Sequence, residues 1–361
     1  MQSARDQIDS LTGLRAAVAI WVILMHFREI TPTRVWEYPI GDSLIANGAF
    51  GVDIFFVLSG FILSHVYINT FHGCLRADQV RRFLVFRLAR IYPVHLVTFV
   101  AMLALAGAKV MISGSDGLPE RYDPETIITT LTLTHSWIPG IQSPNMPSWS
   151  ISGEWFAYIA FPALCILMWR NKWAPALYIG AALGLVVFKP PSYDSLANAL
   201  AAFLVGMVAY HSVLPVAGRF RFGRLTGLGV AAMIVVWAQG PGPRNEIGLL
   251  LSASLIVALA DSRDLLSQLL SLRLIVYLGE ISYSLYMIHW PVRVAVRNVL
   301  QMLGLLDTLH PAVVVSAYLT ATLLGAIASY HFIELPGRAW LRTAANLFGQ
   351  RPASTANVGR G

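Results

Sequence analysis

Cysteine and charged residues are scarce in this chain. Two of its 361 residues are cysteine, and charged residues make up 12%. Cys74 falls in a polar connection and Cys165 within an apolar stretch, which argues against a disulfide and provides no metal-ligand cluster. We therefore expect neither a disulfide framework nor a metal centre. An internal repeat of the kind that suggests an inverted-repeat transporter is also missing.

Hydrophobic residues, in contrast, make up 56% of the chain, and the mean hydropathy is +0.61. These values place the whole chain among membrane proteins. A helix needs about 20 apolar residues to cross the hydrocarbon core. On this basis we predict an all-α polytopic membrane protein, with a transmembrane domain over residues 1–340 and a short, polar, disordered tail over 341–361. Roughly ten spans are expected, near 12–28, 50–70, 92–111, 149–169, 173–188, 195–213, 225–239, 246–261, 274–300 and 311–333.

Basic residues cluster in alternate connections between these spans, which predicts that those connections are cytoplasmic. The connection at 112–148 instead carries four acidic residues against Arg121 alone, so we place it outside. An even number of spans then puts both termini in the cytoplasm. The net charge of +7 is explained by this topology, and no nucleic-acid partner is needed. The basic residues are Arg76, Arg81, Arg82, Arg87, Arg90, Arg170, Lys172, Arg219, Arg221, Arg224, Arg263, Arg273, Arg338, Arg342, Arg351 and Arg360.

Two ionisable residues lie in the first span. Arg15 and His26 are eleven residues apart, close to three helical turns, so both side chains lie on one face of the helix. At about 1.5 Å per residue they are roughly 16 Å apart along the axis. Ionisable groups in a membrane usually mark a pathway or a reaction site. The alternative is a snorkelling arginine and an interfacial histidine.

Two carboxylates are expected to reach the depth of His26. Asp53 lies one turn inside the second span and Glu154 near the outer start of the fourth. A carboxylate on one imidazole nitrogen orients the ring and leaves the other nitrogen as a base, as in many acyl-transfer enzymes. The sequence therefore predicts that His26, Asp53 and Glu154 form one layer. The alternative for His26 and Asp53 is a buried hydrogen bond between helices that is structural only. Gly51, Ser59 and Gly60 are expected to serve helix packing instead.

Further polar residues occur at both ends of the spans. Arg87 and Arg90, spaced i, i+3 at the cytoplasmic entry to the third span, form a fork suited to phosphate; the alternative is a topology anchor. Weaker candidates for binding the substrate or an oxyanion are Ser148, Ser150, Tyr283 and His289, although tyrosines are also common at membrane interfaces. His331 and Glu334 are expected to be interfacial.

Five motifs follow one another in order, and together they resemble the integral-membrane acyltransferase family 3 from about Asp9 to Pro336. They are Arg-x10-His (15–26), Gly-Val-Asp-x-Phe-Phe-Val-Leu-Ser-Gly-Phe (51–61), Arg-x-x-Arg-Ile-x-Pro (87–93), Ser-Trp-Ser-x-Ser-x-Glu (148–154) and Leu-Gly-x-Ile-Ser-Tyr-Ser-Leu-Tyr-x-x-His-x-Pro (278–291).

The resemblance implies a ten-span enzyme of the bacterial cytoplasmic (inner) membrane. It would move an acyl group, commonly acetyl from cytoplasmic acetyl-CoA, to a hydroxyl of a glycan or other acceptor. The family's critical residues correspond to Arg15, His26, Asp53 and Glu154, and its arginine pair to Arg87 and Arg90. Gly153 departs from the larger residue often found before the glutamate, which would widen the pocket.

Residues and resemblance together predict a division of labour across the membrane. Arg87, Arg90 and Arg15 would receive the CoA phosphates, and His26 would act as general base or form a transient acyl-histidine. The expected acceptor is a surface polysaccharide or a lipid-linked oligosaccharide. A small natural product such as a macrolide is the alternative, and a transporter is the rival class. Relatives often carry a fused extracytoplasmic hydrolase-like domain, so this shorter chain is expected to act alone or with separate partners, such as polysaccharide-assembly proteins.

Overall fold

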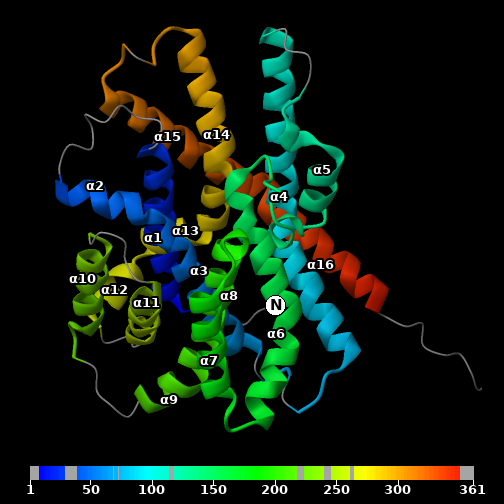
Figure 1. Ribbon diagram of the computed structural model, residues 1–361, viewed down its shortest axis with the longest axis vertical. Coiled ribbons are helices and arrows are strands. Elements are labelled where there is room, and N and C mark those ends of the chain that lie inside the picture. The colour runs from blue at the N-terminus through cyan, green and yellow to red at the C-terminus, as the bar shows by residue number, and fades with distance from the viewer. Residues whose placement is uncertain are drawn as a thin grey trace, which may run out of the picture.

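The computed structural model describes residues 8–28, 39–67, 69–71, 73–113, 118–217, 223–239, 245–260, 264–306 and 308–349, and all regular structure in these ranges is helical (Figure 1). Asp116, Arg219, Arg221, Arg263, Arg351 and Arg360, on which part of the topology prediction rests, lie outside the described residues. The α-helices are α1 (Asp9–Arg28), α2 (Pro39–Ala46), α3 (Phe50–Tyr67), α4 (Ala77–Ser113), α5 (Pro124–Leu131), α6 (Trp149–Arg170), α7 (Ala174–Phe188), α8 (Asp194–Val208), α9 (Leu214–Ala217), α10 (Thr226–Ala238), α11 (Asn245–Leu259), α12 (Leu265–Leu270), α13 (Arg273–Glu280), α14 (Ser282–Met302), α15 (Pro311–Ser329) and α16 (Leu335–Gly349).

Six helical segments of the described chain are long and apolar enough to cross a membrane. They correspond to α1, α3, α4, α6, α8 and the nearly continuous pair α15 and α16. Three shorter apolar helices match α7, α10 and α11. The multi-pass, all-helical class predicted from the sequence is therefore confirmed, whereas the count of ten spans and the position of the termini stay predictions.

Glycine allows α3 and α8 to pack backbone against backbone. A Cβ atom on Gly60 would stand 2.1 Å from the carbonyl oxygen of Phe203, and one on Gly206 would stand 2.0 Å from that of Val57. Any larger residue would therefore force the helices apart. Small residues at helix contacts are the usual means of close packing inside a membrane. The predicted packing role of Gly60 is confirmed, and Gly51 similarly packs against Val18 and Val22 of α1.

The predicted span at 274–300 is divided into two helices. α13 ends at Glu280 and α14 begins at Ser282. A Cβ on Gly279 would stand 1.9 Å from the carbonyl oxygen of Thr12, so this break is also where the chain passes closest to α1. After the break, α14 runs along α1 as far as the contact of His289 with His26 in the last turn of α1.

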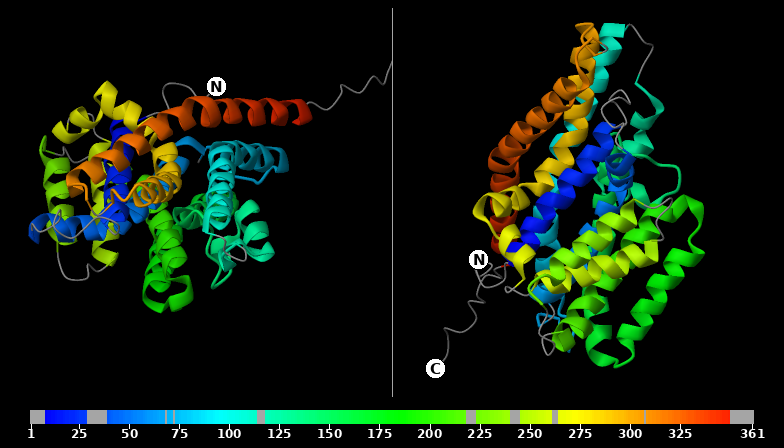
Figure 2. Two further views of the ribbon diagram at one scale, coloured as in Figure 1. Left: turned by 90° about the horizontal axis from the view of Figure 1, so that it is seen from above. Right: turned by 90° about the vertical axis from the view of Figure 1, so that its left-hand side faces the viewer.

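The helices α4 and α16 extend beyond the predicted spans. α4 begins at Ala77 rather than near residue 92, and at about 1.5 Å per residue its 37 residues reach roughly 55 Å, well beyond the hydrocarbon core. α16 packs on it, because Gly337 lies against Pro93. Residues 341–349 continue α16 instead of starting the expected tail. Seen from above, α16 runs out on one side of the bundle while α10, α11 and α12 lie on the other (Figure 2).

The two cysteines provide a test of the topology. Cys74 is exposed between α3 and α4, whereas Cys165 is buried. Because the positive-inside rule puts this connection in the cytoplasm, a membrane-impermeant maleimide should label inside-out vesicles and leave intact cells unlabelled. Cys74→Ser should remove the labelling. Gln142→Cys in that background, exposed in the connection predicted to lie outside, should be labelled in intact cells. The reverse pattern would overturn the orientation.

Candidate functional site

A cavity of about 370 Å³ lies where the start of α1, the end of α3, the start of α4 and α16 meet. Arginine is the most frequent polar residue of its wall, and aliphatic side chains of α1 and α3 form most of the apolar lining. We call this space the arginine cavity. A guanidinium-rich cavity is suited to phosphate, because each guanidinium offers several N–H donors in a planar fork. The charged residues that line it are Arg15, Arg87, Arg90, Arg338, Arg342, Glu154 and Glu280.

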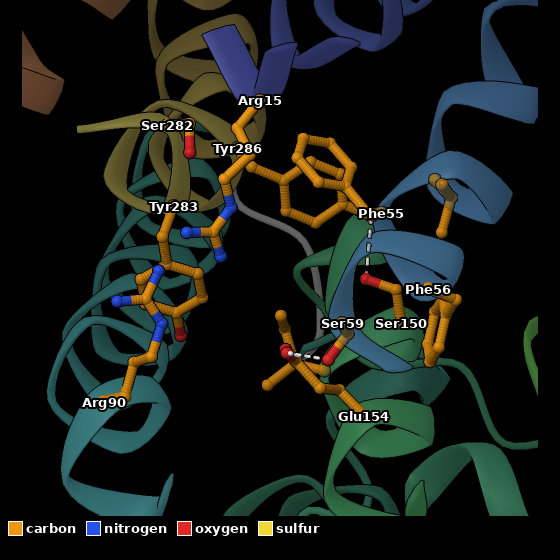
Figure 3. A pocket seen from close by; sticks show the side chains of 12 residues that line it. Arg15, Phe55, Phe56, Ser59, Arg90, Ser150, Glu154, Ser282, Tyr283 and Tyr286 are labelled. Carbon is orange, nitrogen blue, oxygen red and sulfur yellow. Dashed lines mark hydrogen bonds between the residues drawn. The ribbon is translucent and has the colours of Figure 1, made fainter. Parts of the chain in front are cut away.

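A smaller space of about 70 Å³, the inner cavity, adjoins the arginine cavity (Figure 3). Four residues line both spaces, so together they form a polar path into the bundle: Arg15, Ser59, Arg90 and Glu154. In Figure 3 the two arginines approach from one side, and Ser59 and Glu154 from the other. The remaining polar lining of the inner cavity comes from α6 and α14, namely Ser150, Ser282, Tyr283 and Tyr286.

Glu154 and Arg15 both lie at the junction of the two cavities. Its carboxylate accepts a short hydrogen bond from Tyr158 and a long one, 3.5 Å, from Ser59. Glu154 is also the carboxylate that interacts electrostatically with Arg15, whose other charged neighbours are Arg90 and Arg338. The predicted layer with His26 is therefore not what the structure shows. Glu154 lies in the layer of Arg15 instead.

His26 pairs with a second histidine. Its Nδ1 lies 3.2 Å from Nε2 of His289, and the two ring centroids are 5.0 Å apart. Both residues are buried, and Trp290 packs edge-on against His26 with a centroid distance of 5.4 Å. His26 is not among the residues that line the two cavities. Tyr286 lines the inner cavity and lies 5.8 Å from the ring of His289, so it stands between that cavity and the histidine pair.

The hydrogen bonds of this pair determine its tautomers. The backbone carbonyl of Tyr286 can only accept, so Nδ1 of His289 carries the hydrogen. In the neutral ring Nε2 of His289 is then an acceptor, and Nδ1–H of His26 donates to it. With both rings neutral, Nε2 of His26 then keeps its lone pair; the backbone of Val22 is a further hydrogen-bond partner of the His26 ring. A general base requires such a lone pair. The hydrogen-bond acceptor that orients the His26 ring is thus a second histidine, whereas a carboxylate was expected.

Asp53 faces another part of the bundle. Its electrostatic neighbours are Lys189 and Asp194, which themselves form a salt bridge of 2.6 Å. Gly51 contacts α1, and Asp53, two residues later, points about 200° away around the helix. The expected pairing of Asp53 with His26 is therefore not what the structure shows, because the rotation of α3 directs the carboxylate away from α1.

The weaker candidates divide between the inner cavity and its surroundings. Ser150 and Tyr286 share a hydrogen bond of 2.9 Å at the cavity wall, and Tyr283 donates to the backbone carbonyl of Ile91. Ser148 instead bonds His135 at 3.3 Å, away from both cavities. His135 lies in the connection between α5 and α6, and burial lowers its pKa to about 4. Ser148 is thus a partner of a neutral histidine rather than a cavity residue.

Three residues near the start of α16 were not predicted to belong to the site. Arg338 and Arg342 were read as topology markers, yet both line the arginine cavity. Glu334, expected at the interface, is fully buried, forms an ion pair with Arg338 and accepts a hydrogen bond of 2.6 Å from Ser284. The i, i+4 spacing of Glu334 and Arg338 within an apolar helix was the signal that could have found them.

Known proteins resemble this chain over most of its length. The family model described as an acyltransferase domain matches residues 8–331. Acyltransferase MdmB of Streptomyces mycarofaciens is 28% identical over 79% of each chain. Peptidoglycan O-acetyltransferase OatA of Listeria monocytogenes is 22% identical over 93% of this chain and 56% of its own length, so this chain spans little more than half of that relative. No solved structure is significantly similar.

Replacing Glu154 tests the charge balance at the junction. Glu154→Gln keeps an acceptor for Tyr158 but leaves Arg15 facing Arg90 and Arg338. We expect the variant to be destabilised by about 1–3 kcal/mol, the usual cost of removing the partner of a buried charged group. Thermal unfolding in detergent measures this. Glu125→Gln, at an exposed position of α5, is the matched control, and an equal melting temperature for both variants would show that Arg15 is balanced elsewhere.

Proposed function

The chain belongs to the integral-membrane acyltransferase family 3, and from this premise we propose that it is an O-acyltransferase that uses cytoplasmic acetyl-CoA. The acceptor in this proposal is a hydroxyl of a bacterial surface polysaccharide or of its lipid-linked precursor, and the enzyme acts in the bacterial inner membrane. The observation that carries the proposal is the polar path through the bundle. It begins at five arginines and ends at Tyr286, whose ring centroid lies 5.8 Å from that of His289, the hydrogen-bond partner of His26.

The donor enters at the arginine cavity. On the predicted topology this cavity lies at the cytoplasmic end, because the first turns of α1 and the last turns of α3 line it. Arg87 and Arg90 bind phosphate through charge-assisted contacts. The pantetheine arm then passes Arg15 and Glu154 into the inner cavity. At about 70 Å³ this cavity is much smaller than the arginine cavity, and we place the acyl group there.

Transfer takes place at His26. Its Nε2 removes the proton from the acceptor hydroxyl while the oxygen attacks the thioester carbonyl, the carbon–sulfur bond breaks, and the CoA thiolate takes the proton back from the imidazolium. His289 holds His26 in the required tautomer through the bond between the two rings. A transient acyl-histidine on the same Nε2 is the alternative route. The acceptor approaches from the side of His26 opposite the inner cavity.

The length of α1 separates the two tasks. Arg15 and His26 are roughly 16 Å apart along the helix, and side chains in a helix lean toward its N-terminus. Arg15 therefore reaches into both cavities, whereas His26 lies about three turns further along α1 and lines neither. We assign Arg15 and Glu154 to binding the donor arm. His26 acts as the base toward the acceptor hydroxyl and His289 orients it, so Asp53 has no part in orienting the base.

We consider two classes of acceptor. The name of the peptidoglycan O-acetyltransferase relative favours a glycan. The acyltransferase relative that matches 79% of each chain has a name without an acceptor, and a small natural product such as a macrolide is our second candidate. A transporter, the rival class, has no need of an arginine cavity that leads to a histidine pair.

The histidine pair generates a prediction on catalysis. His26→Ala should lower turnover by roughly 10²–10⁴-fold, the contribution of a general base, or further if an acyl-histidine forms. His289→Ala should lower kcat less and leave CoA binding unchanged, because it removes only the acceptor for Nδ1–H. His289→Gln should restore part of the loss, since its amide oxygen can accept that hydrogen bond.

The control for this series is Asp53→Asn, which changes a carboxylate on the neighbouring helix α3. It should lower the rate less than His26→Ala does. All variants are purified and checked for folding before assay with acetyl-CoA. Turnover near wild type in folded His26→Ala would remove the assignment of the base. An unchanged kcat in His289→Ala would show that the ring needs no second histidine.

The acceptor proposal predicts a change in surface chemistry. Deleting the gene should lower O-acetylation of the surface glycan and leave its sugar composition unchanged, because only the ester bond depends on this enzyme. Ester-linked acetate released by mild base measures the effect, and complementation with wild-type or His26→Ala chain separates catalysis from assembly. Loss of acylation from a secreted small molecule, with unchanged glycan, would favour the second candidate.

A further inference from the structure

Three guanidinium groups in the arginine cavity have buried nitrogen atoms without a partner in the described part of the chain. These are the Nε atoms of Arg87, Arg338 and Arg342. A buried N–H group without an acceptor costs on the order of a hydrogen bond, so such groups are rare in folded proteins. Three such atoms on residues that line one cavity favour an acceptor-rich ligand, which these side chains would turn to reach.

The charges of the cavity point to the same conclusion. Five arginines line it against two glutamates, and Arg338 is further paired with the buried Glu334. The arginines also oppose one another. Arg342 interacts unfavourably with Arg87 and Arg90, and Arg338 with Arg90 and Arg342. Like charges held close together favour a bound anion, so the expected ligand carries several negative charges.

Arg338 and Arg342 are held in the cavity wall by packing. α16 is fixed on α4 where Gly337 meets Pro93, with a hypothetical Cβ only 2.7 Å from the proline ring. Arg342 stacks on the ring of Phe86, 5.5 Å from its centroid, and Arg87 stacks on Tyr67 at 5.1 Å. A residue that merely anchors topology at the membrane surface needs no such aromatic support. These guanidinium groups are instead oriented in advance, which lowers the entropy lost on binding a phosphate.

We propose that Arg338 and Arg342 of α16, together with Arg87 of α4, bind the nucleotide phosphates of the donor. The proposal rests on the proposed function and adds a donor specificity to it. CoA carries a 3′-phosphate and a diphosphate, whereas the arm of an acyl carrier protein carries one phosphodiester. A cavity with five guanidinium groups on two sides matches the first donor better. The site therefore selects free acyl-CoA over an acyl group on a carrier protein.

Donor analogues test this assignment with the full chain in detergent. Arg342→Ala is the main variant, because no carboxylate forms an ion pair with Arg342 in the described chain, whereas removing Arg338 would leave Glu334 buried without its partner. Arg342→Ala should weaken binding of CoA and of adenosine 3′,5′-bisphosphate by roughly 10- to 100-fold, as expected for a lost hydrogen bond between charged groups. The KM for S-acetyl-pantetheine, which has no phosphate, should stay unchanged.

Two further variants serve as controls. Arg342→Lys should fall between wild type and Arg342→Ala, since it keeps the charge and loses the fork. Arg170 is an exposed arginine at the end of α6, and Arg170→Ala should bind both nucleotides as wild type does.

The donor specificity is tested on the wild-type protein. Acetyl carried on an acyl carrier protein should be a poorer donor than acetyl-CoA.

The outcomes separate the two proposals. Unchanged affinity of Arg342→Ala for both nucleotides, or an equal rise of KM for acetyl-CoA and S-acetyl-pantetheine, would overturn the phosphate assignment while acyl transfer stands. Arginine-dependent binding of adenosine 3′,5′-bisphosphate without any transfer from acetyl-CoA would overturn the proposed function while the phosphate site stands. A wild-type protein that binds neither nucleotide would overturn both.

Discussion

The balance of charge inside an apolar bundle is the constraint on which the rest of this site depends. An ionised group far from water must find an opposite charge or hydrogen-bond partners, because the cost of removing it from water amounts to several kcal/mol. Glu334 supplies this for Arg338 through an ion pair, and Glu154 attracts Arg15 electrostatically. The arginine cavity nevertheless holds more positive charge than its carboxylates neutralise. The unfilled requirement for negative charge is what makes the cavity a candidate phosphate site.

The first helix organises the function by its length alone. Arg15 and His26 share one face of α1 but are roughly 16 Å apart, so no single small group can touch both. A donor with phosphates at one end and a thioester at the end of a long arm can connect them. The same separation places the arginine cavity and the histidine pair in different layers of the bundle. In the proposed reaction, donor binding and acyl transfer would therefore occur at two positions along one helix.

Close helix contacts bring these layers together. Gly60 and Gly206 let α3 and α8 touch through their backbones, and Gly279 does the same for α13 against α1. The break that follows Gly279 directs Ser282 and Tyr283 toward the inner cavity and lets His289 reach His26 two turns later. In a membrane, where apolar contact with lipid competes with contact between helices, such packing supplies much of the association energy. The geometry of the site is a consequence of where glycine permits approach.

The sequence by itself determined the class of this protein. Hydropathy marked a helical membrane protein, the five motifs marked the family, and periodicity placed Arg15 and His26 on one face. Depth could be estimated from position in a span, but the rotation of each helix about its axis could not. Only the tertiary structure decided that Asp53 turns away from α1 and that His26 pairs with His289, 263 residues later. A side chain's partner depends on the rotation and contact of two helices, and a single helical pattern contains neither.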